Sequence, residues 1–278
     1  MARIPAFQAG GPGSNPGPRI FIPIKGYFYK IWKKDNRMKV VLLCAGYSTR
    51  LYPITLNQPK CLLPVGNKKM LDHIMDKLHP LNVDEFILIS NNKFHDLFVN
   101  WARGHCKNFT IINNGTNSKE ERLGAVGDLH KAVKELELDD DLLVIGTDNL
   151  FEFNAQHLHD FFNQKEGSVV AVCDLKDPAK LSKKFGTIEH DHEHKIVGFE
   201  EKPENPKTSL ASTCCYLFSR DGLKHLPEFI ATKNPDNSGD FIRYLMKKDS
   251  VYAWPFKEEW ADIGTHDDYK EACEKYSN

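Results

Sequence analysis

Residues 42–53 read Leu-Leu-Cys-Ala-Gly-Tyr-Ser-Thr-Arg-Leu-Tyr-Pro, and residues 58–65 read Gln-Pro-Lys-Cys-Leu-Leu-Pro-Val. The apolar run over 39–43 predicts a buried strand that ends in a turn of small residues. Backbone N–H groups in such a turn can approach phosphate oxygens, and Arg50 and Lys60 can close on one polyphosphate from two sides. The turn matches neither the P-loop pattern nor the dinucleotide-binding pattern. We therefore expect a phosphate-handling loop of another kind directly after the first strand.

Short apolar strands alternate with amphipathic helices beyond this loop. The pattern predicts further strands over 86–89, 109–112, 142–145 and 169–173, and helices over 70–78, 97–103, 129–138, 241–248 and 267–276. Such alternation is typical of an α/β fold with a doubly wound, mostly parallel, Rossmann-like sheet, which binds its ligands at the carboxyl ends of the strands. The second half is richer in hairpins, with extended segments at 186–189, 196–200 and 212–218. These segments predict a small β-rich lid subregion over the sheet.

The composition is that of a globular protein, with 41% hydrophobic and 27% charged residues in a chain of 278. The sequence contains no run of about 18 apolar residues, so we expect no membrane span. With 37 Lys and Arg against 38 Asp and Glu, the net charge of −1 argues against a protein built to hold nucleic acid. The seven cysteines are odd in number and lack CxxC spacing, which indicates reduced core thiols and a cytoplasmic location.

Residues 1–37 differ from the rest of the chain. They hold 5 of the 18 glycines, 5 of the 15 prolines, and seven basic residues against one acidic residue. We expect either a disordered extension or a segment that the native protein lacks, with translation starting at Met38. Residues 38–278 are then the folded domain. The intact mass of the protein from its native host distinguishes the two cases.

The stretch from Leu43 to Val65 resembles the signature of the sugar-phosphate nucleotidyltransferases, which is close to L-x-x-G-x-G-T-R-L-x-P-x-T followed by P-K-x-L-L-P-V. The resemblance continues in the family's order through Gly146–Phe151, Phe199–Pro203 and Trp260–Thr265, and covers the chain from Met38 to the C-terminus. It implies a nucleotidyltransferase fold of the GT-A-like type. It also implies a reaction in which a sugar 1-phosphate attacks the α-phosphorus of a nucleoside triphosphate and pyrophosphate leaves.

The resemblance implies a role for individual residues. Arg50 and Lys60 would stabilise the triphosphate and the developing pyrophosphate, and Lys202 would contact the sugar phosphate. Glu201 would accept hydrogen bonds from sugar hydroxyls. Asp148 and Asp262 would hold Mg²⁺, which accepts two carboxylates together with waters and phosphate oxygens. The residues expected to bind the nucleotide are Ala45, Gly46, Ser48, Thr49 and Gly124.

This sequence departs from the family pattern at three places. Ser48 stands where the family usually has glycine, which restricts the φ angles of the phosphate loop and adds a hydroxyl that can donate to phosphate. Cys214 stands near a family glycine in a T-G-x-Y segment, so we expect a differently shaped sugar pocket. Upstream of Gly124, where pyrimidine-specific members carry a glutamine, this chain has Glu120 and Glu121. A carboxylate there can accept from a cytosine amino group, which keeps CTP open beside dTTP and UTP.

Several alternatives remain open from the sequence. The expected product is a dTDP-, UDP- or CDP-sugar, and the first alternative is a cytidylyltransferase that acts on a non-sugar phosphate. The second is a catalytically silent regulatory protein that binds a nucleotide sugar. A regulatory protein has no need of both metal carboxylates, which favours an enzyme. We expect a single activity, leave a homo-oligomer open, and expect Trp254 and Trp260 to pack in the core.

Overall fold

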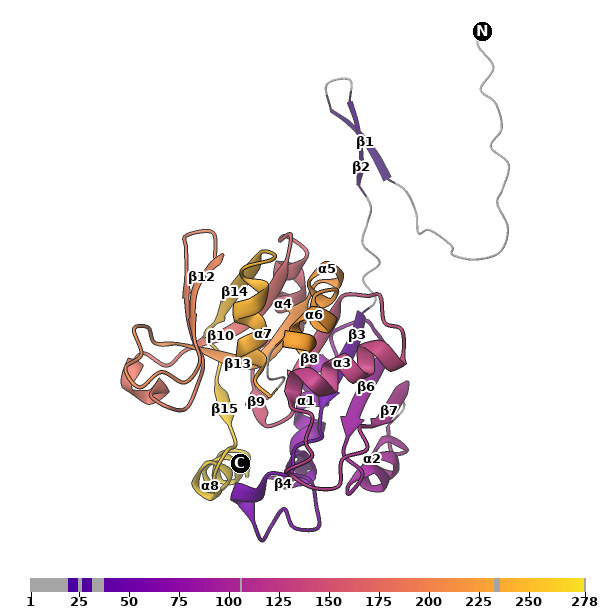
Figure 1. Ribbon diagram of the computed structural model, residues 1–278, viewed down its shortest axis with the longest axis vertical. Helices are drawn as coiled ribbons and strands as arrows, with labels where there is room; N and C mark the ends of the chain where they lie inside the picture. Colours follow the sequence, from indigo (N-terminus) through magenta and orange to yellow (C-terminus); the bar gives the residue numbers. More distant parts are fainter. Residues whose placement is uncertain (1–19, 25–26, 32–37, 106, 233–235, 278) are drawn as a thin grey trace, which may run out of the picture. The chain divides into compact units, whose positions relative to one another are not determined.

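The computed structural model describes residues 20–24, 27–31, 38–105, 107–232 and 236–277, and divides into two units, Met1–Arg37 and Met38–Asn278 (Figure 1). In the first unit, strand β1 (Ile20–Ile24) pairs antiparallel with β2 (Tyr27–Ile31). The other residues of this unit lie outside the described part of the chain. The expectation that residues 1–37 are disordered or absent from the native protein therefore stays a prediction.

The second unit is built on a nine-stranded sheet. Strand β3 (Met38–Leu43) lies between β6 (Val83–Ser90) and β8 (Leu142–Gly146), parallel to both, and β7 (Phe109–Asn113) continues the parallel set beside β6. Beyond β8 the sheet continues through the antiparallel strand β13 (Leu210–Phe218). The mostly parallel, Rossmann-like α/β fold predicted from the sequence is confirmed.

A β-rich region extends the sheet beyond β13. Strand β13 pairs with β10 (Ser168–Asp174), which runs parallel to β14 (Val251–Phe256). The hairpin of β11 (Thr187–His190) and β12 (Ile196–Glu200) also joins the sheet through β13. Figure 1 shows this hairpin projecting from the main body of the second unit. The hairpin-rich second half predicted from the sequence is thus present, and it continues the central sheet.

Helices cover both faces of the sheet because consecutive strand residues are apolar and point to opposite faces. Val40 and Leu42 of β3 face one core, and Val41 between them faces the other. The first core includes residues of α1 (Met70–Leu78), α2 (His95–Ala102) and α4 (Ala155–Phe162). The second core includes residues of α3 (Ala125–Glu135), α6 (Leu226–Thr232) and α7 (Ser238–Leu245). In the described part of the chain, no helix has the length and apolar character needed to cross a membrane.

Short elements complete the fold near the carboxyl ends of the parallel strands. They are β4 (Pro64–Val65), β5 (Lys68–Lys69), β9 (Asn149–Phe151), β15 (Trp260–Asp262), α8 (His266–Lys275) and the 3-10 turns Thr49–Leu51, Lys60–Leu62 and Pro178–Leu181. Helix α5 (Arg220–Leu223) lies at the opposite end of the sheet, because β13 ends beside the start of β8. Strand β9 pairs antiparallel with β15. Because β9 starts three residues after β8, this ribbon lies where a parallel sheet places its ligands.

Most predicted elements are present, but several bounds differ. The helix predicted over 129–138 runs from Ala125 to Glu135 because Gly124, with a φ of 78°, starts it earlier. The helix predicted over 241–248 begins at Ser238, after the extended residue Asn237. In both cases the first turn contains small residues that do not follow the apolar period. Helix α4 and strand β14 were not among the predicted elements.

Candidate active site

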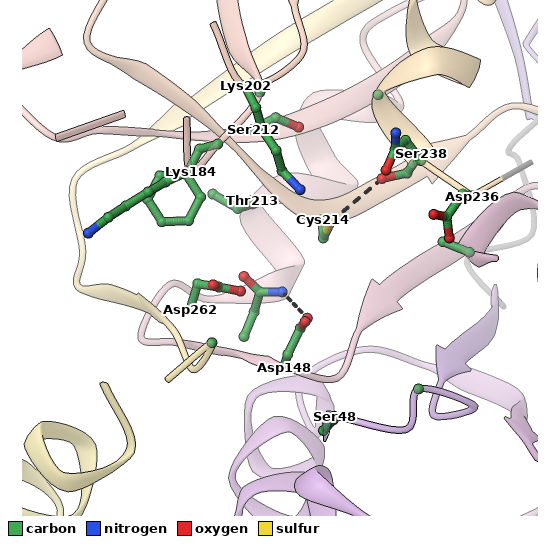
Figure 2. Close-up of a pocket in the computed structure, with 18 of the residues that line it drawn as sticks. Ser48, Asp148, Lys184, Lys202, Ser212, Thr213, Cys214, Asp236, Ser238 and Asp262 are labelled. Atoms are coloured by element: carbon green, nitrogen blue, oxygen red, sulfur yellow. Dashed lines mark hydrogen bonds between the residues drawn. The ribbon is translucent and has the colours of Figure 1, made fainter. Parts of the chain in front are cut away.

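A cleft opens at the carboxyl ends of β3 and β8 (Figure 2). Its larger lobe has a volume of about 490 Å³ and its smaller lobe about 320 Å³. Gly46, Ser48, Lys60 and Asp148 line both lobes, so the two lobes form one cleft. The other predicted site residues are Thr49, Arg50, Glu201, Lys202 and Asp262 in the larger lobe, and Ala45 and Gly124 in the smaller lobe. The structure brings every one of them to this cleft, and their roles stay predictions.

The loop after β3 is held in shape by buried polar contacts. The Asn91 amide donates to the carbonyl oxygen of Ala45 at 3.0 Å, and the hydroxyls of Tyr47 and Thr116 are 3.1 Å apart. Ser48 takes a left-handed conformation, with φ 47° and ψ 42°, which for a residue other than glycine costs about 1 kcal/mol. The loop therefore keeps a conformation that suits glycine, and serine adopts it at the expense of strain.

Lys60 reaches the cleft from a 3-10 turn and is largely buried, with 13% of its side chain exposed. Its ammonium group donates to the Asp148 carboxylate at 3.2 Å and to the carbonyl oxygen of Ile263 at 2.7 Å. A buried ammonium group needs such partners, because its desolvation is otherwise uncompensated. These contacts fix a positive charge at the centre of the cleft.

The ribbon of β9 and β15 carries the two carboxylates together. Asp262 lies opposite Asn149 in the ribbon, and Asn149 follows Asp148 directly. The Asn149 amide donates to Asp148 at 2.8 Å and in turn accepts a bond from the Trp260 indole N–H at 2.8 Å. Burial, together with the nearby charge of Asp148, raises the pKa of Asp262 to about 7. The two carboxylates are therefore close enough to repel each other, and they are the candidate metal ligands.

Glu201 and Lys202 enter from the end of β12. The Lys202 ammonium lies 3.8 Å from the Glu201 carboxylate, and Figure 2 shows the Lys202 side chain extending into the cleft. The Glu201 carboxyl packs against two glycines: a β-carbon on Gly239 would lie 2.2 Å from Oε2, and one on Gly186 would lie 3.2 Å from it. Burial raises the pKa of Glu201, and the Lys202 charge opposes that shift. The carboxylate is thus desolvated and ready to accept hydrogen bonds.

The structure adds cleft residues that the sequence analysis did not find. Arg122 forms a bidentate ion pair with Asp236, at 3.0 Å and 2.6 Å, which joins the segment before α3 to the segment before α7. Arg122 holds the pKa of Asp236 below its usual range. The two residues are 114 positions apart, and no local pattern marks either of them.

The segment before α3 presents cations to the cleft. Lys119 and Arg122 line it, and neither Glu120 nor Glu121 is among its lining residues. The Glu121 carboxylate accepts from the backbone N–H of Asn117 at 2.8 Å and so serves the loop itself. The proposed contact of a glutamate with a cytosine amino group gains no support from this geometry.

The two tryptophans considered in the sequence have different environments. Trp254 packs edge-on against Phe153 in the core, with ring centroids 5.2 Å apart, as predicted. Trp260 also packs against this core, as predicted, and in addition it lines the cleft, where it meets Phe185 edge-on at 5.0 Å. Its position inside the Trp260–Thr265 segment was the available signal.

Comparisons with known proteins agree with this geometry. The sequence profile of the nucleotidyl transferase family matches residues 39–278. The bifunctional protein GlmU of Methanocaldococcus jannaschii is 31% identical over 236 residues, which cover 84% of this chain and 53% of that protein. A protein of Sulfolobus acidocaldarius assigned as a mannose-1-phosphate guanyltransferase is 28% identical over 235 residues, or 84% of this chain and 61% of that protein.

A solved structure has the same fold. It is a crystal structure of a Bacillus anthracis protein assigned as a glucose-1-phosphate thymidylyltransferase, in complex with a sucrose. Its TM-score is 0.75 at 26% identity, and the match covers 87% of this chain and 96% of that one. The chain spans about half to two thirds of the length of the curated relatives that it matches. The profile match, the relatives and the cleft agree that this chain belongs to the nucleotidyl transferase family, among the sugar-phosphate nucleotidyltransferases.

Proposed function

We propose that this protein transfers a nucleoside monophosphate from a nucleoside triphosphate to a sugar 1-phosphate, with release of pyrophosphate. The observation that carries the proposal is the convergence of Arg50, Lys60 and Lys202 with Asp148 and Asp262 in one cleft. An in-line displacement at phosphorus depends on positioning and charge neutralisation. Three cations and two carboxylates on separate elements supply both.

The cations divide between the two substrates. Arg50 and Lys60 come from the loops that follow β3, so we assign them to the triphosphate and the leaving pyrophosphate. Lys202 extends into the cleft from the end of β12, on the side across from Ser48 in Figure 2, and we assign it to the sugar phosphate that attacks. Each cation then faces one reactant, and the two phosphates approach each other without full charge repulsion.

Asp148 and Asp262 fit a magnesium site by their chemistry. Mg²⁺ binds through one or two carboxylates and keeps several waters and substrate phosphates as its other ligands. Burial and the charge of Asp148 raise the pKa of Asp262, and a bound cation would offset both effects. When bound, Mg²⁺ neutralises charge on the phosphates during the displacement. The bonds from Trp260 to Asn149 and from Asn149 to Asp148 hold the Asp148 carboxylate in place.

The two alternatives give different results in a single assay. A cytidylyltransferase for a non-sugar phosphate needs the same charged residues with another acceptor. A silent regulatory homologue would not need both Asp148 and Asp262, so their presence in the cleft favours an enzyme. The described cysteines are free, in keeping with the cytoplasmic location that we propose.

The test is pyrophosphate release with Mg²⁺ across a matrix of dTTP, UTP, CTP, GTP and ATP against several sugar 1-phosphates and phosphocholine. We expect release with a sugar 1-phosphate, and its loss in Asp148→Asn. Release with phosphocholine alone would support the non-sugar alternative. No release in any combination, with nucleotide binding intact, would support the regulatory alternative.

A further inference from the structure

Cys214 lies where strand β13 is irregular. The pairing of β13 with β10 shifts register between Val170 and Val172, which lie opposite Tyr216 and Ser212. The four residue steps from Ser212 to Tyr216 on β13 thus lie opposite only two steps on β10. Cys214 lies in this bulge and has a φ of 52°. Bulges re-aim side chains and often lie beside active sites. Here the bulge directs the Cys214 side chain toward the cleft, out of the regular alternation of side chains between the two faces of the sheet.

The side chain of Cys214 occupies the junction of the two lobes. It lines both of them, and in Figure 2 it lies between Lys202 and Asp148. A β-carbon built on Gly146, two residues before Asp148, would lie 2.9 Å from the β-carbon of Cys214. Residue 214 therefore adjoins the segment that carries the first candidate metal ligand.

Polar neighbours fix the thiol in this position. The Tyr216 hydroxyl donates to Sγ of Cys214 at 3.5 Å, and Oγ of Ser238 lies 3.6 Å from the same sulfur. The hydroxyls of Tyr216 and Ser238 are 2.8 Å apart. Burial, with the charge of Asp148, raises the pKa of Cys214 to about 11, so the group at this place is a neutral thiol. Its contribution to the cleft is shape more than charge.

We propose that the Cys214 side chain sets the size limit of the acceptor pocket, so that the cleft takes an unsubstituted hexose 1-phosphate and rejects one with an N-acetyl group on the ring. The proposal rests on the proposed function and adds the class of acceptor. A glycine at residue 214 would leave the junction open, and its left-handed backbone suits glycine without strain. One methylene in a pocket changes selectivity by about 10-fold to 200-fold, and a CH₂SH group is larger than that.

The test compares glucose 1-phosphate with N-acetylglucosamine 1-phosphate in the wild type, Cys214→Gly and Cys214→Ser. The readout is the ratio of kcat/KM for the two acceptors, with the nucleoside triphosphate that gives release. We expect the wild type to prefer glucose 1-phosphate and Cys214→Gly to lower that preference about tenfold or more. Cys214→Ser, which keeps the size, should stay within about threefold of the wild-type ratio.

Three results would overturn the size limit. The first is an unchanged ratio in Cys214→Gly, and the second is a wild-type preference for the N-acetylated acceptor. The third is a change in Cys214→Gly that affects only the KM of the nucleoside triphosphate and is the same with either acceptor. Residue 214 would then shape the part of the cleft that binds the nucleotide.

The size limit and the proposed function can fail separately. A wild type that releases no pyrophosphate contradicts the proposed function. Calorimetric affinities of the wild type and Cys214→Gly for the same two sugar phosphates then test the size limit alone. The size limit would be overturned if Cys214→Gly left the ratio of the two affinities unchanged, or if neither sugar phosphate bound.

Discussion

Ser48 and Cys214 show how the fold constrains single residues. Both take left-handed backbone conformations, which favour glycine. The neighbouring structure fixes these backbone angles, since Thr55 donates to the carbonyl oxygen of Ser48 and the bulge opposite β10 includes Cys214. Each residue holds this conformation and presents its side chain to the cleft. Strain of this kind persists only where the surroundings over-determine the conformation.

Asp148 gives the first prediction at this scale. Asp148→Asn keeps the shape of the side chain and removes the negative charge that faces Lys60 and the proposed magnesium ion. We expect kcat for pyrophosphate release to fall by about 10²-fold or more, a loss typical of a missing electrostatic contact at the reacting centre. Asp221→Asn, at an exposed residue paired with Lys224, is the control and should keep its activity. Activity of Asp148→Asn within about threefold of the wild type would contradict the assignment.

Asp128 gives a prediction about pH. It is 7% exposed and accepts from the Asn114 amide at 2.8 Å, and burial raises its pKa to about 6. The folded state therefore binds the proton more tightly than the unfolded state, so this carboxyl lowers stability as the pH rises from about 4 to 6. Asparagine keeps the acceptor and never ionises.

We expect Asp128→Asn to gain about 2–3 kcal/mol of unfolding free energy relative to the wild type between pH 4 and pH 7.5. Urea unfolding of both proteins at the two pH values measures this change. A difference between the proteins that does not vary with pH would show that Asp128 does not titrate as described.

At the scale of elements, the ribbon of β9 and β15 is the part that assembles the site. It joins residues 149–151 to residues 260–262, and the backbone N–H of Ile263 donates to the carbonyl oxygen of Asp148 at 2.9 Å. Helix α8 follows at once, and its capping box between Thr265 and Asp268 fixes the chain just after the ribbon. The backbone at Asp262 is thereby held by elements on both sides of it.

The start of helix α7 gives a prediction about the side of the cleft where Glu201 is expected to bind the sugar 1-phosphate. Gly239 packs on the Glu201 carboxyl and the Phe199 ring, which a β-carbon would approach to 2.2 Å and 2.7 Å. Gly239→Ala should displace Glu201, raise the KM for the sugar 1-phosphate about tenfold and cost about 1–3 kcal/mol of stability. The KM for the nucleoside triphosphate should not change.

Gly104→Ala is the matched control for this change. A β-carbon on Gly104 would meet only a backbone oxygen at 3.4 Å. Steady-state kinetics with each substrate varied in turn measure both values. An equal rise of the KM for the sugar 1-phosphate and the KM for the nucleoside triphosphate in Gly239→Ala would contradict the prediction. It would mean that α7 supports the whole cleft and not only the side that carries Glu201.

For the whole molecule, the second unit contains both hydrophobic cores and every residue of the cleft. Such a unit should fold without the segment before Met38. We expect residues 38–278 alone to keep pyrophosphate release and a Tm within about 2 °C of the full chain, since the residues of both cores all lie within this unit. Calorimetric unfolding of both proteins tests this prediction, and a lower Tm or lost activity would show that residues 1–37 contribute to the domain.

Metal removal also acts on the molecule as a whole. A chelator should abolish pyrophosphate release, and added Mg²⁺ should restore it, because Asp148 and Asp262 need a cation to hold the phosphates. Nucleoside triphosphate at about 100 times its Kd should stabilise the protein by about 2.7 kcal/mol, and only when Mg²⁺ is present. Stabilisation that is equal without Mg²⁺ would place the metal outside the binding step.

The sequence by itself determined the parallel sheet, the loop after the first strand and the candidate residues. These follow from local patterns: the alternation of apolar runs, small residues at a strand end, and motifs in which neighbouring residues act together, such as Glu201 with Lys202. All of the candidates line the cleft. Interactions within a few residues are sufficient to specify such features.

Only the tertiary structure decided which distant residues meet. The pair of Arg122 and Asp236, the bond from Trp260 to Asn149 and the place of Cys214 at the junction of the lobes depend on strand order and on a bulge in β13. Strand order and bulges depend on packing between segments far apart in the chain, and a local sequence pattern does not predict that packing. The sequence motifs therefore indicated which residues take part in the proposed reaction, and the packing of the sheet determined the shape of the cleft that they line.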